Sequence, residues 1–488
     1  MCATYRDKQK RSHFESFANK IYTGIREIKP EYAEKRAIWE LFQNALDTLD
    51  KNGIIEIART EKGLLFKHNG RAFKDDEFGG LIKQFSVGKK YGDNKEKLGQ
   101  YGTGFISTHV YGKIISVHGS IQTDDGTYRT LKDFEIDRDA TSIEILTDKL
   151  LVQDNIIEQL CDNNQLSEQA PLPFTSFEYH ANESSKVHID EMLKYIESIL
   201  PYIFCFNEKL AEVKLFNNNS TQIYTSSGQT NGVLTILKNG MPITIPFLHN
   251  SEKGVKVIMG AENRQLKDLP KQFLFYPLME TVETGYNFIV HANDFKPNKE
   301  RDFLHKDIGN DDLKSDVETN HKLLESSIDL VLKLVEEDET VSFIDVAKIE
   351  FTALDSDFEK KLKVKYIDKI KDLEKLEFGC GKHSIAKMQY FDESILLLGD
   401  AVKRSIYNVL TQFRSMPPFE MFCELSKYVN NWNANRDQKL STLELKDIGE
   451  IIAKESGGNY FYIADKPSFK DFISEISTDI TLLNRFAL

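Results

Sequence analysis

The segment Leu98-Gly99-Gln100-Tyr101-Gly102-Thr103-Gly104-Phe105 decides the fold that this sequence predicts. Its three glycines leave a run of backbone N–H groups with few side chains in front of them. Glycine permits the positive φ angles that let adjacent amides converge on one anion, and a helix starting near Phe105 adds the positive end of its dipole. The segment therefore predicts a polyphosphate cradle. The alternative is a tight turn between a strand and a helix.

A second segment, from Glu34 to Asp47, has the spacing of an amphipathic helix. At about 100° per residue its apolar side chains cluster on one side. Its polar side chains lie within an arc of roughly 80° on the other side, namely Arg36, Glu40, Asn44 and Asp47. An amide oxygen can ligate Mg2+, and a carboxylate one turn earlier can orient and deprotonate a water. The stripe therefore predicts a nucleotide-hydrolysing site, although a solvated helix face has the same pattern.

Three segments in this order resemble the ATP-site motifs of the GHKL superfamily, which comprises gyrase, the ninety-kilodalton heat-shock chaperones, MutL and histidine kinases. They are Glu40 to Asp47, Lys67-His68-Asn69-Gly70-Arg71-Ala72-Phe73, and Leu98 to Phe105. The glycine-rich segment is most similar to the chaperone branch, and the His-Asn-Gly segment to the sacsin-like and bacterial ATPases of that branch. The resemblance covers about residues 30 to 180. It implies a Bergerat α/β sandwich that binds ATP and Mg2+.

Transferred residue by residue, the resemblance implies that Glu40 is the general base and Asn44 a Mg2+ ligand, with Asp47 near the nucleotide. It also implies that the segment from Gly99 to Phe105 holds the phosphates. Four further residues would belong to a lid, from about Ser86 to Gln100, that closes over them: Ser86, Gly88, Lys89 and Lys90. For the two lysines, the alternative is a solvated loop.

The second motif departs from the common pattern, in which an aspartate accepts the amino hydrogens of adenine and two glycines follow. This chain has His68 at the aspartate position and Ala72 in place of the second glycine. A neutral imidazole can still accept one hydrogen bond, as can the Asn69 side chain or an intervening water. Asn69-Gly70 between the apolar run Leu64–Phe66 and Phe73 also predicts a hairpin turn as the alternative. GHKL proteins have a threonine beside the base on a late strand of the sandwich. The resemblance implies that Thr175, which opens a strand with alternating polarity, is this threonine.

A fourth segment, Pro297-Asn298-Lys299-Glu300-Arg301-Asp302-Phe303-Leu304, follows a predicted strand over Asn287 to Phe295. It resembles the middle-domain loop of the heat-shock chaperones, whose arginine reaches the terminal phosphate. A guanidinium suits that role because it stays charged and offers planar donors as negative charge develops. Arg301 is the candidate for this contact with the terminal phosphate, and Lys296 and Lys299 are the alternatives to it. A basic loop that caps the following helix is the alternative.

Composition agrees with a large intracellular protein. The chain has 488 residues, too many for one core, and we expect about three domains. Its net charge of −13 disfavours a nucleic-acid partner. Its five cysteines show no metal-binding spacing, which predicts reduced thiols in the cytoplasm: Cys2, Cys161, Cys205, Cys380 and Cys423. We find no apolar run long enough for a membrane span or a signal peptide.

The predicted fold class is α+β, with three domains. Residues 1–185 form the GHKL ATP-binding sandwich, residues 186–312 a transducer-like α/β domain, and residues 313–488 a mainly helical region. Asp154 to Pro173 is predicted to be a surface insertion. The second sheet is predicted to contain the strand candidates Val213–Phe216, Gly232–Leu237 and Phe288–Val290.

The sequence therefore predicts a Mg2+-dependent ATPase that works as a conformational switch, closing on ATP and associating with a second copy or another protein. The resemblance to bacterial sacsin-like proteins implies a chaperone-like role or one in defence against phage. A binding module without turnover is the main alternative, which the altered His68 motif favours. A DNA-associated ATPase of the MutL or gyrase kind is a third reading, which the acidic charge balance disfavours.

Overall fold

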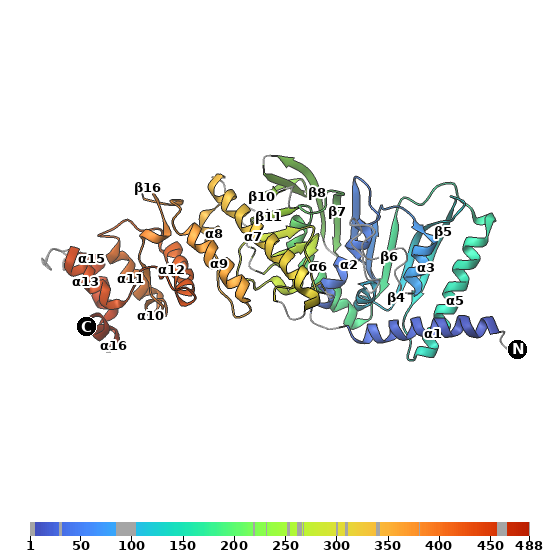
Figure 1. Cartoon of the computed structure of the whole chain (residues 1–488), viewed down its shortest axis with the longest axis horizontal. Helices are drawn as coiled ribbons and strands as arrows, with labels where there is room; N and C mark the ends of the chain where they lie inside the picture. Colours follow the sequence, from blue (N-terminus) through green and yellow to red (C-terminus); the bar gives the residue numbers. More distant parts are fainter. Residues whose placement is uncertain are drawn as a thin grey trace. The chain divides into compact units, whose positions relative to one another are not determined.

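The computed structural model describes residues 5–28, 32–83, 104–217, 220–230, 232–250, 254–260, 266, 268–298, 301–307, 311–337, 342–379, 381–455 and 466–487. The chain divides into two compact units, residues 1–245 and 246–488, and the boundary falls within β10 (Met241–Asn250). Both units combine helices with a sheet, so the fold is mixed α/β (Figure 1). Within the described ranges, no helix has the length and apolar character needed to cross a lipid bilayer.

Unit 1 is built on a mixed sheet whose strand order is β9, β8, β7, β1, β2, β6, β4, β3, with β5 also paired to β4. Most neighbours are antiparallel, whereas β1 with β7 and β3 with β4 are parallel. Alternation of apolar residues, such as the buried Ile55 and Ile57, gives the strands one core face. The strands are β1 Gly53–Arg59, β2 Gly63–His68, β3 Phe73–Lys74, β4 Ile114–Gln122, β5 Tyr128–Asp137, β6 Thr175–His180, β7 Leu210–Asn217, β8 Ser220–Thr230 and β9 Val233–Lys238.

Helices pack against this sheet and against one another. The helix predicted from Glu34 to Asp47 is confirmed as α2, which buries Ile38, Leu41 and Phe42 and packs against α6. At the other end of the sheet α1 packs against α5, and Lys10 of α1 pairs with Asp154 of α5. The helices are α1 Tyr5–Arg26, α2 Ala33–Leu46, α3 Asp75–Lys83, α4 Gly104–Ser107, α5 Ile143–Asp162 and α6 Glu183–Ile203, with short 3-10 turns at Thr108–Val110 and Asn164–Leu166.

The structure corrects two predictions in unit 1. Val213–Phe216 and Gly232–Leu237 do not belong to a second sheet, because β7 pairs with β1 and the sheet continues through β8 and β9. The predicted surface insertion is wrong over its first half, since α5 continues to Asp162. Asp154 is buried there because it pairs with Lys10 at 3.0 Å and Lys83 at 2.6 Å. Those ionic partners allow a polar residue to face inward.

Unit 2 begins with five strands that are neighbours in the order β10, β11, β14, β12, β13. Its parallel pair is β12 with β14, and the strand predicted over Asn287 to Phe295 is shorter, as β14. The remaining strands are β11 Val255–Ile258, β12 Gln272–Leu274, β13 Tyr276–Pro277 and β14 Ile289–Ala292, with the small pairs β15 Leu376–Phe378 with β16 Gly381–His383 and β17 Tyr390–Phe391 with β18 Thr442–Leu443.

The rest of unit 2 is largely helical, as predicted. One continuous cluster of buried apolar residues runs from Val255 of β11 through α7 to Leu482 near the end of the chain. Strands and helices therefore share one core in this unit. The structure divides the chain into two units, and the division into three domains stays a prediction. The helices are α7 Lys314–Glu337, α8 Phe343–Val346, α9 Asp357–Ile370, α10 Glu393–Leu396, α11 Asp400–Leu410, α12 Phe419–Ala434, α13 Leu445–Glu455, α15 Pro467–Ile476 and α16 Ile480–Ala487.

Candidate functional site

The polar stripe of α2 is half-buried rather than fully exposed. Glu40, Asn44 and Asp47 all have intermediate exposure, while Phe42 on the opposite side is completely buried. No hydrogen bond to the Asn44 amide comes from any residue that the structure describes. An exposed helix face would show higher exposure, so the stripe faces a partly enclosed region.

The start of α4 lies directly against this stripe. A Cβ added to Gly104 would stand 1.8 Å from Oε2 of Glu40 and 2.7 Å from its Oε1. Only glycine leaves the Glu40 carboxylate its observed position, because real Cβ contacts are much longer. The last glycine of the glycine-rich segment and the predicted general base are therefore neighbours in space. Phe105, the next residue, is buried in α4.

The His-Asn-Gly segment reaches the other end of the same stripe. The Arg71 N–H donates to the carbonyl of Thr48 (3.0 Å), one residue beyond Asp47. A Cβ on Gly70 would stand 2.1 Å from the Thr48 hydroxyl oxygen, so the two backbones approach closely only because residue 70 is glycine. The structure thus brings described parts of all three motif segments together around α2.

Asn69 has a structural role that the sequence did not predict. Its side-chain oxygen accepts from the Ile54 N–H (2.7 Å), and its amide donates to the Asn52 carbonyl (3.1 Å). These bonds tie the end of β2 to the start of β1. The alternative hairpin at Asn69-Gly70 is wrong, since β2 pairs with β1 and β6 while β3 pairs with β4.

His68 ends β2 and is only 4% exposed. The Gly70 N–H donates to its Nδ1 (3.2 Å). Burial lowers the pKa of His68 to about 4, so the ring is neutral at pH 7. Because Nδ1 accepts a hydrogen bond, the single ring proton of the neutral form is on Nε2.

Thr175 is the direct partner of His68 in the pairing of β2 with β6, and it is buried. Beside it, a Cβ on Gly119 of β4 would approach the Thr175 hydroxyl to 3.1 Å. The His68 ring stacks near Phe177, with centroids 6.4 Å apart, and Phe177 in turn contacts Phe105. This end of the site is therefore aromatic and enclosed, and the Glu40 end is polar.

The low pKa of His68 makes a prediction about acid stability. Unfolded, the ring takes up a proton near pH 6.5, whereas the folded ring does so near pH 4. The free energy of unfolding is therefore unaffected by this ring above pH 6.5. It falls by about 3 kcal/mol in all as the pH drops from 6.5 to 4, because only the unfolded ring binds a proton in that range. Urea unfolding of His68→Asn should therefore depend less on pH than that of the parent. His118→Asn, which makes the same substitution at an exposed site on β4, is the control.

The other residues assigned to the phosphate cradle and lid lie outside the described residues, namely Ser86, Gly88, Lys89, Lys90, Gly99, Gln100, Tyr101, Gly102 and Thr103. Their assignments stay predictions. Lys299 lies outside the described residues as well.

In unit 2, Arg301 lies in a tight loop and has an unusual backbone conformation. Its φ is 60°, in the left-handed region that favours glycine, and its N–H donates to the Asn298 carbonyl (3.0 Å). The Asn298 side chain accepts from the Asp302 N–H (2.7 Å), which holds the turn closed. Backbone strain of this kind is concentrated at functional sites. Leu304 bridges back to Pro297, and α7 begins at Lys314.

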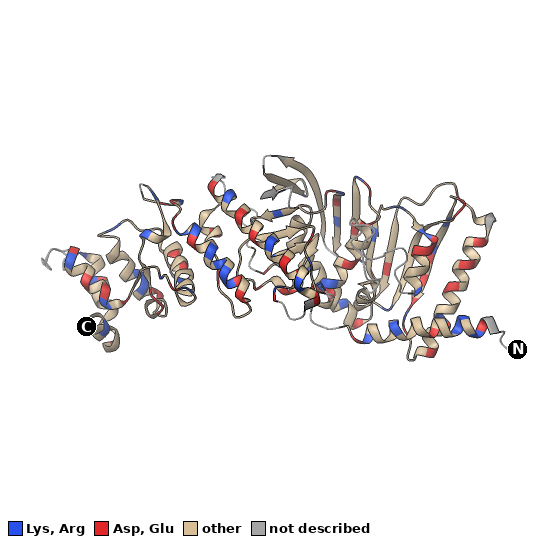
Figure 2. Ribbon diagram, viewed as in Figure 1, with Lys and Arg blue, Asp and Glu red and all other residues tan. Residues whose placement is uncertain are grey.

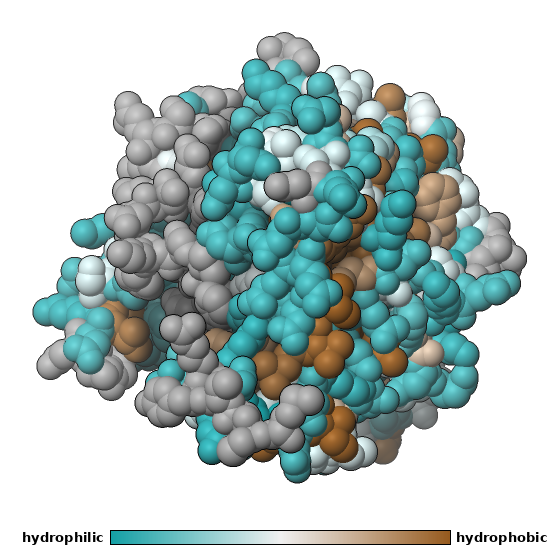
Figure 3. Space-filling view, turned by 90° about the vertical axis from the view of Figure 1, so that its right-hand side faces the viewer, coloured by the Kyte–Doolittle hydropathy of each residue, from teal (hydrophilic) through white to brown (hydrophobic). Residues whose placement is uncertain are grey.

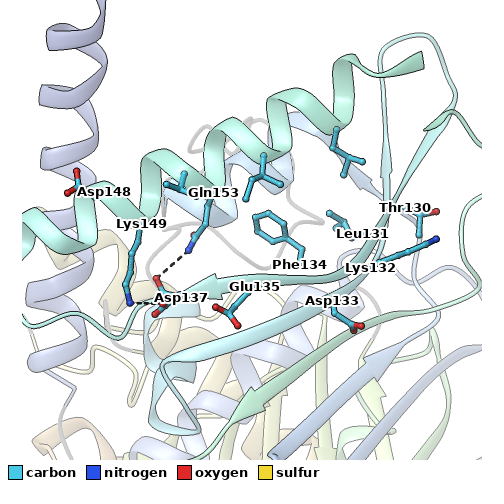
Figure 4. Close-up of a pocket in the computed structure, with 13 residues that line it drawn as sticks. Thr130, Leu131, Lys132, Asp133, Phe134, Glu135, Asp137, Asp148, Lys149 and Gln153 are labelled. Carbon is cyan, nitrogen blue, oxygen red and sulfur yellow. Dashed lines mark hydrogen bonds and ion pairs between the residues drawn. The ribbon is translucent and has the colours of Figure 1, made fainter. Parts of the chain in front are cut away.

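A separate groove of about 640 Å³ lies between α5 and β5 (Figure 4). Leu131 and Phe134 point toward the helix, and at one end Lys149 pairs with Asp137 (2.5 Å). On this face of unit 1, Figure 3 shows apolar patches surrounded by polar surface. The groove contains none of the predicted site residues; it is lined by Thr130, Leu131, Lys132, Asp133, Phe134, Glu135, Asp137, Asp148, Lys149, Val152, Gln153, Ile156 and Leu160.

Sequence reasoning missed Thr48, which contacts Gly70, and Gly119, which makes room beside Thr175. Nothing in the sequence around Thr48 or Gly119 indicates these contacts, because each contact is made with a residue on another strand or loop. Among known proteins, neither the family models nor the curated sequences give a match to this chain.

Proposed function

We propose that this protein is an ATP-binding, Mg2+-dependent ATPase of the GHKL type whose nucleotide site is organised by α2. One observation carries the proposal. Segments far apart in the sequence meet at one polar helix face, with Gly104 against Glu40 at one end and Gly70 against Thr48 at the other. Glycines at both contacts keep side chains away from the space beside the stripe, as a bound phosphate or base requires.

Within this proposal each residue has a distinct task. Glu40 orients a water and accepts its proton during attack on the terminal phosphate. The N–H groups at the start of α4, around Gly104 and Phe105, bind phosphate oxygens. His68 and Thr175 line the base side, where the aromatic surroundings suit a planar ring. Asp47 lies near the nucleotide, as the resemblance implies.

The residues present fit a metal that the substrate helps to hold. In the described ranges, no group of three or more His, Cys, Asp or Glu side chains could hold a metal ion. Mg2+ in nucleotide sites keeps several waters and is bound by one or two protein oxygens together with phosphates, so the Asn44 amide suffices on the protein side. When bound, the metal would neutralise phosphate charge.

Calorimetry with ATP and steady-state hydrolysis by the full chain test the proposal directly. We expect binding and a turnover that disappears when EDTA removes Mg2+. A protein that neither binds nor hydrolyses ATP would refute the proposed function. Binding without turnover would instead support the non-hydrolysing module, which the departure at His68 favours.

Gly104→Ala should lower hydrolysis by about 10²-fold, because the new methyl group displaces the Glu40 carboxylate from its position. Gly79→Ala is the matched control, since a Cβ at Gly79 on α3 meets no atom within 4 Å. Circular dichroism should show both variants folded. Full activity in Gly104→Ala would contradict the role of this contact.

Arg301→Ala should lower hydrolysis by about 10²-fold or more and leave ADP affinity unchanged, if its guanidinium binds the terminal phosphate as the resemblance implies. Arg301→Gly should lose as much activity yet be more stable than Arg301→Ala by about 1 kcal/mol, because glycine accepts the positive φ. Equal loss of ADP and ATP affinity would make Arg301 a structural residue. Hydrolysis rates, calorimetry and urea unfolding measure these effects.

A homodimer or a protein partner, and a chaperone-like or defence role in the cytoplasm, remain proposals that rest on the resemblance. The second domain of such a protein would be the transducer. A DNA-associated ATPase is less favoured, because acidic and basic residues alternate along the helix ribbons in the view of Figure 2, and the chain is acidic overall.

A further inference from the structure

His68 is a hydrogen-bond donor in this fold, although the family resemblance places it at the position of an acceptor. Its Nδ1 already accepts from the Gly70 N–H (3.2 Å), and burial keeps the ring neutral. The Gly70 contact is firmly set, because Gly70 is held against Thr48 and the next residue bonds to the Thr48 carbonyl. The ring can therefore not reverse its two nitrogens without losing this bond.

Nε2 carries the proton and has no acceptor among the residues that the structure describes. His68 is 96% removed from solvent, since only 4% of its surface is exposed. Because the ring as a whole has little contact with water, a ligand atom that accepts the Nε2 proton would be bound favourably. A carboxylate at the same place would have the opposite preference, because it only accepts.

The neighbouring groups do not reverse this preference. The Asn69 side-chain oxygen is already used by the Ile54 N–H, and the Asn69 amide by the Asn52 carbonyl. Thr175, opposite His68 on β6, has a hydroxyl that rotates to donate or accept as the ligand demands.

We propose that His68 donates its Nε2 proton to an acceptor atom on the nucleotide base, so that the site does not select for the 6-amino group of adenine. This inference rests on the proposed function, since it takes the base to lie at the His68 end. Suitable acceptors are a ring nitrogen of adenine or of unsubstituted purine, and the 6-oxygen of hypoxanthine. The substrate class is then purine nucleoside triphosphates with differing 6-substituents.

Calorimetry with diphosphates tests this without turnover. We expect ADP, inosine diphosphate and purine riboside diphosphate to bind the full-length protein within about threefold of one another. A site that accepted hydrogen bonds from the amino group would bind the two analogues about 10²-fold more weakly, because a buried acceptor would be left unpaired.

The outcomes separate the two proposals. If ADP binds more than tenfold tighter than both analogues, the inference is overturned and the nucleotide site stands. If no purine nucleotide binds, the proposed function itself fails. Nitrogen-15 spectra of the histidine rings, assigned with His68→Asn, should show Nε2 protonated and Nδ1 unprotonated; a proton on Nδ1 would also overturn the inference.

A substitution provides the converse test. His68→Asp exchanges the donor for an acceptor and should make ADP bind at least tenfold tighter than inosine diphosphate. His118→Asp makes the same change at an exposed position of β4 and should leave the ratio unaltered. Circular dichroism reports whether the variants fold, and a folded His68→Asp that still binds all three diphosphates equally would contradict the role of His68.

Discussion

Replacing Glu40 by glutamine should lower steady-state ATP hydrolysis by about 10²- to 10⁴-fold while ATP still binds. Glutamine has the size of glutamate, so it fits beside Gly104, where the Glu40 oxygens leave no room for a Cβ. It cannot accept a proton from the attacking water, which is the step that a general base performs. Hydrolysis rates and calorimetric affinities, measured on the same preparation, separate the chemical step from binding.

Asp50→Asn is the control for a lost negative charge near the same helix, because Asp50 is exposed just beyond α2. This variant should hydrolyse ATP like the parent. Unchanged turnover in Glu40→Gln would exclude Glu40 as the base. A parallel loss of binding would show that the Glu40 carboxylate organises the site rather than acting on water.

The second large effect concerns the stability of unit 2. Asp355→Ala should lower the free energy of unfolding of this unit by about 3 to 5 kcal/mol. Lys363 donates to both Asp355 oxygens at 2.6 Å and to the Glu350 carbonyl at 2.8 Å, and neither side chain is more than 1% exposed. Burial lowers the pKa of Lys363. Removing the carboxylate leaves the ammonium group without its charged partner in the core.

The chain's two tryptophans allow this measurement, since Trp432 is buried in unit 2 and Trp39 lies in unit 1. In a Trp39→Phe background, fluorescence during urea unfolding reports on unit 2 alone. Asp355→Ala combined with Lys363→Met should be less destabilised than Asp355→Ala, because no charge is then buried unpaired. Glu377→Ala breaks the exposed pair with Lys382 and should cost less than about 1 kcal/mol. A similar cost for both single variants would contradict the argument.

The sequence predicted features that depend on neighbouring residues. The helix around Glu40 and Asn44 follows from a local apolar period, and the start of a helix at the last glycine of the glycine-rich segment follows from local backbone chemistry. Thr175 was correctly placed at the start of a strand. Its position opposite His68 needed the structure, because strand register depends on pairing between distant segments.

Features that depend on distant partners were missed. Asp154 looked like part of a polar surface segment, and only Lys10 and Lys83 make its burial favourable. Asn69-Gly70 has a strong local turn signal, yet the Asn69 side chain bonds to the start of β1. The protonated nitrogen of His68 follows from one hydrogen bond with Gly70, which composition and spacing do not reveal.

The parallel pairing of β1 with β7 also has a consequence for folding during synthesis on the ribosome. During synthesis β1 leaves the ribosome well before Leu210–Asn217, so one edge of β1 stays unpaired until β7 emerges. An open apolar edge is a template for association with other chains, so a nascent chain is exposed to such association during this interval. A fragment ending at residue 185 would keep that edge permanently. The smallest fragment that closes the edge therefore extends through β7.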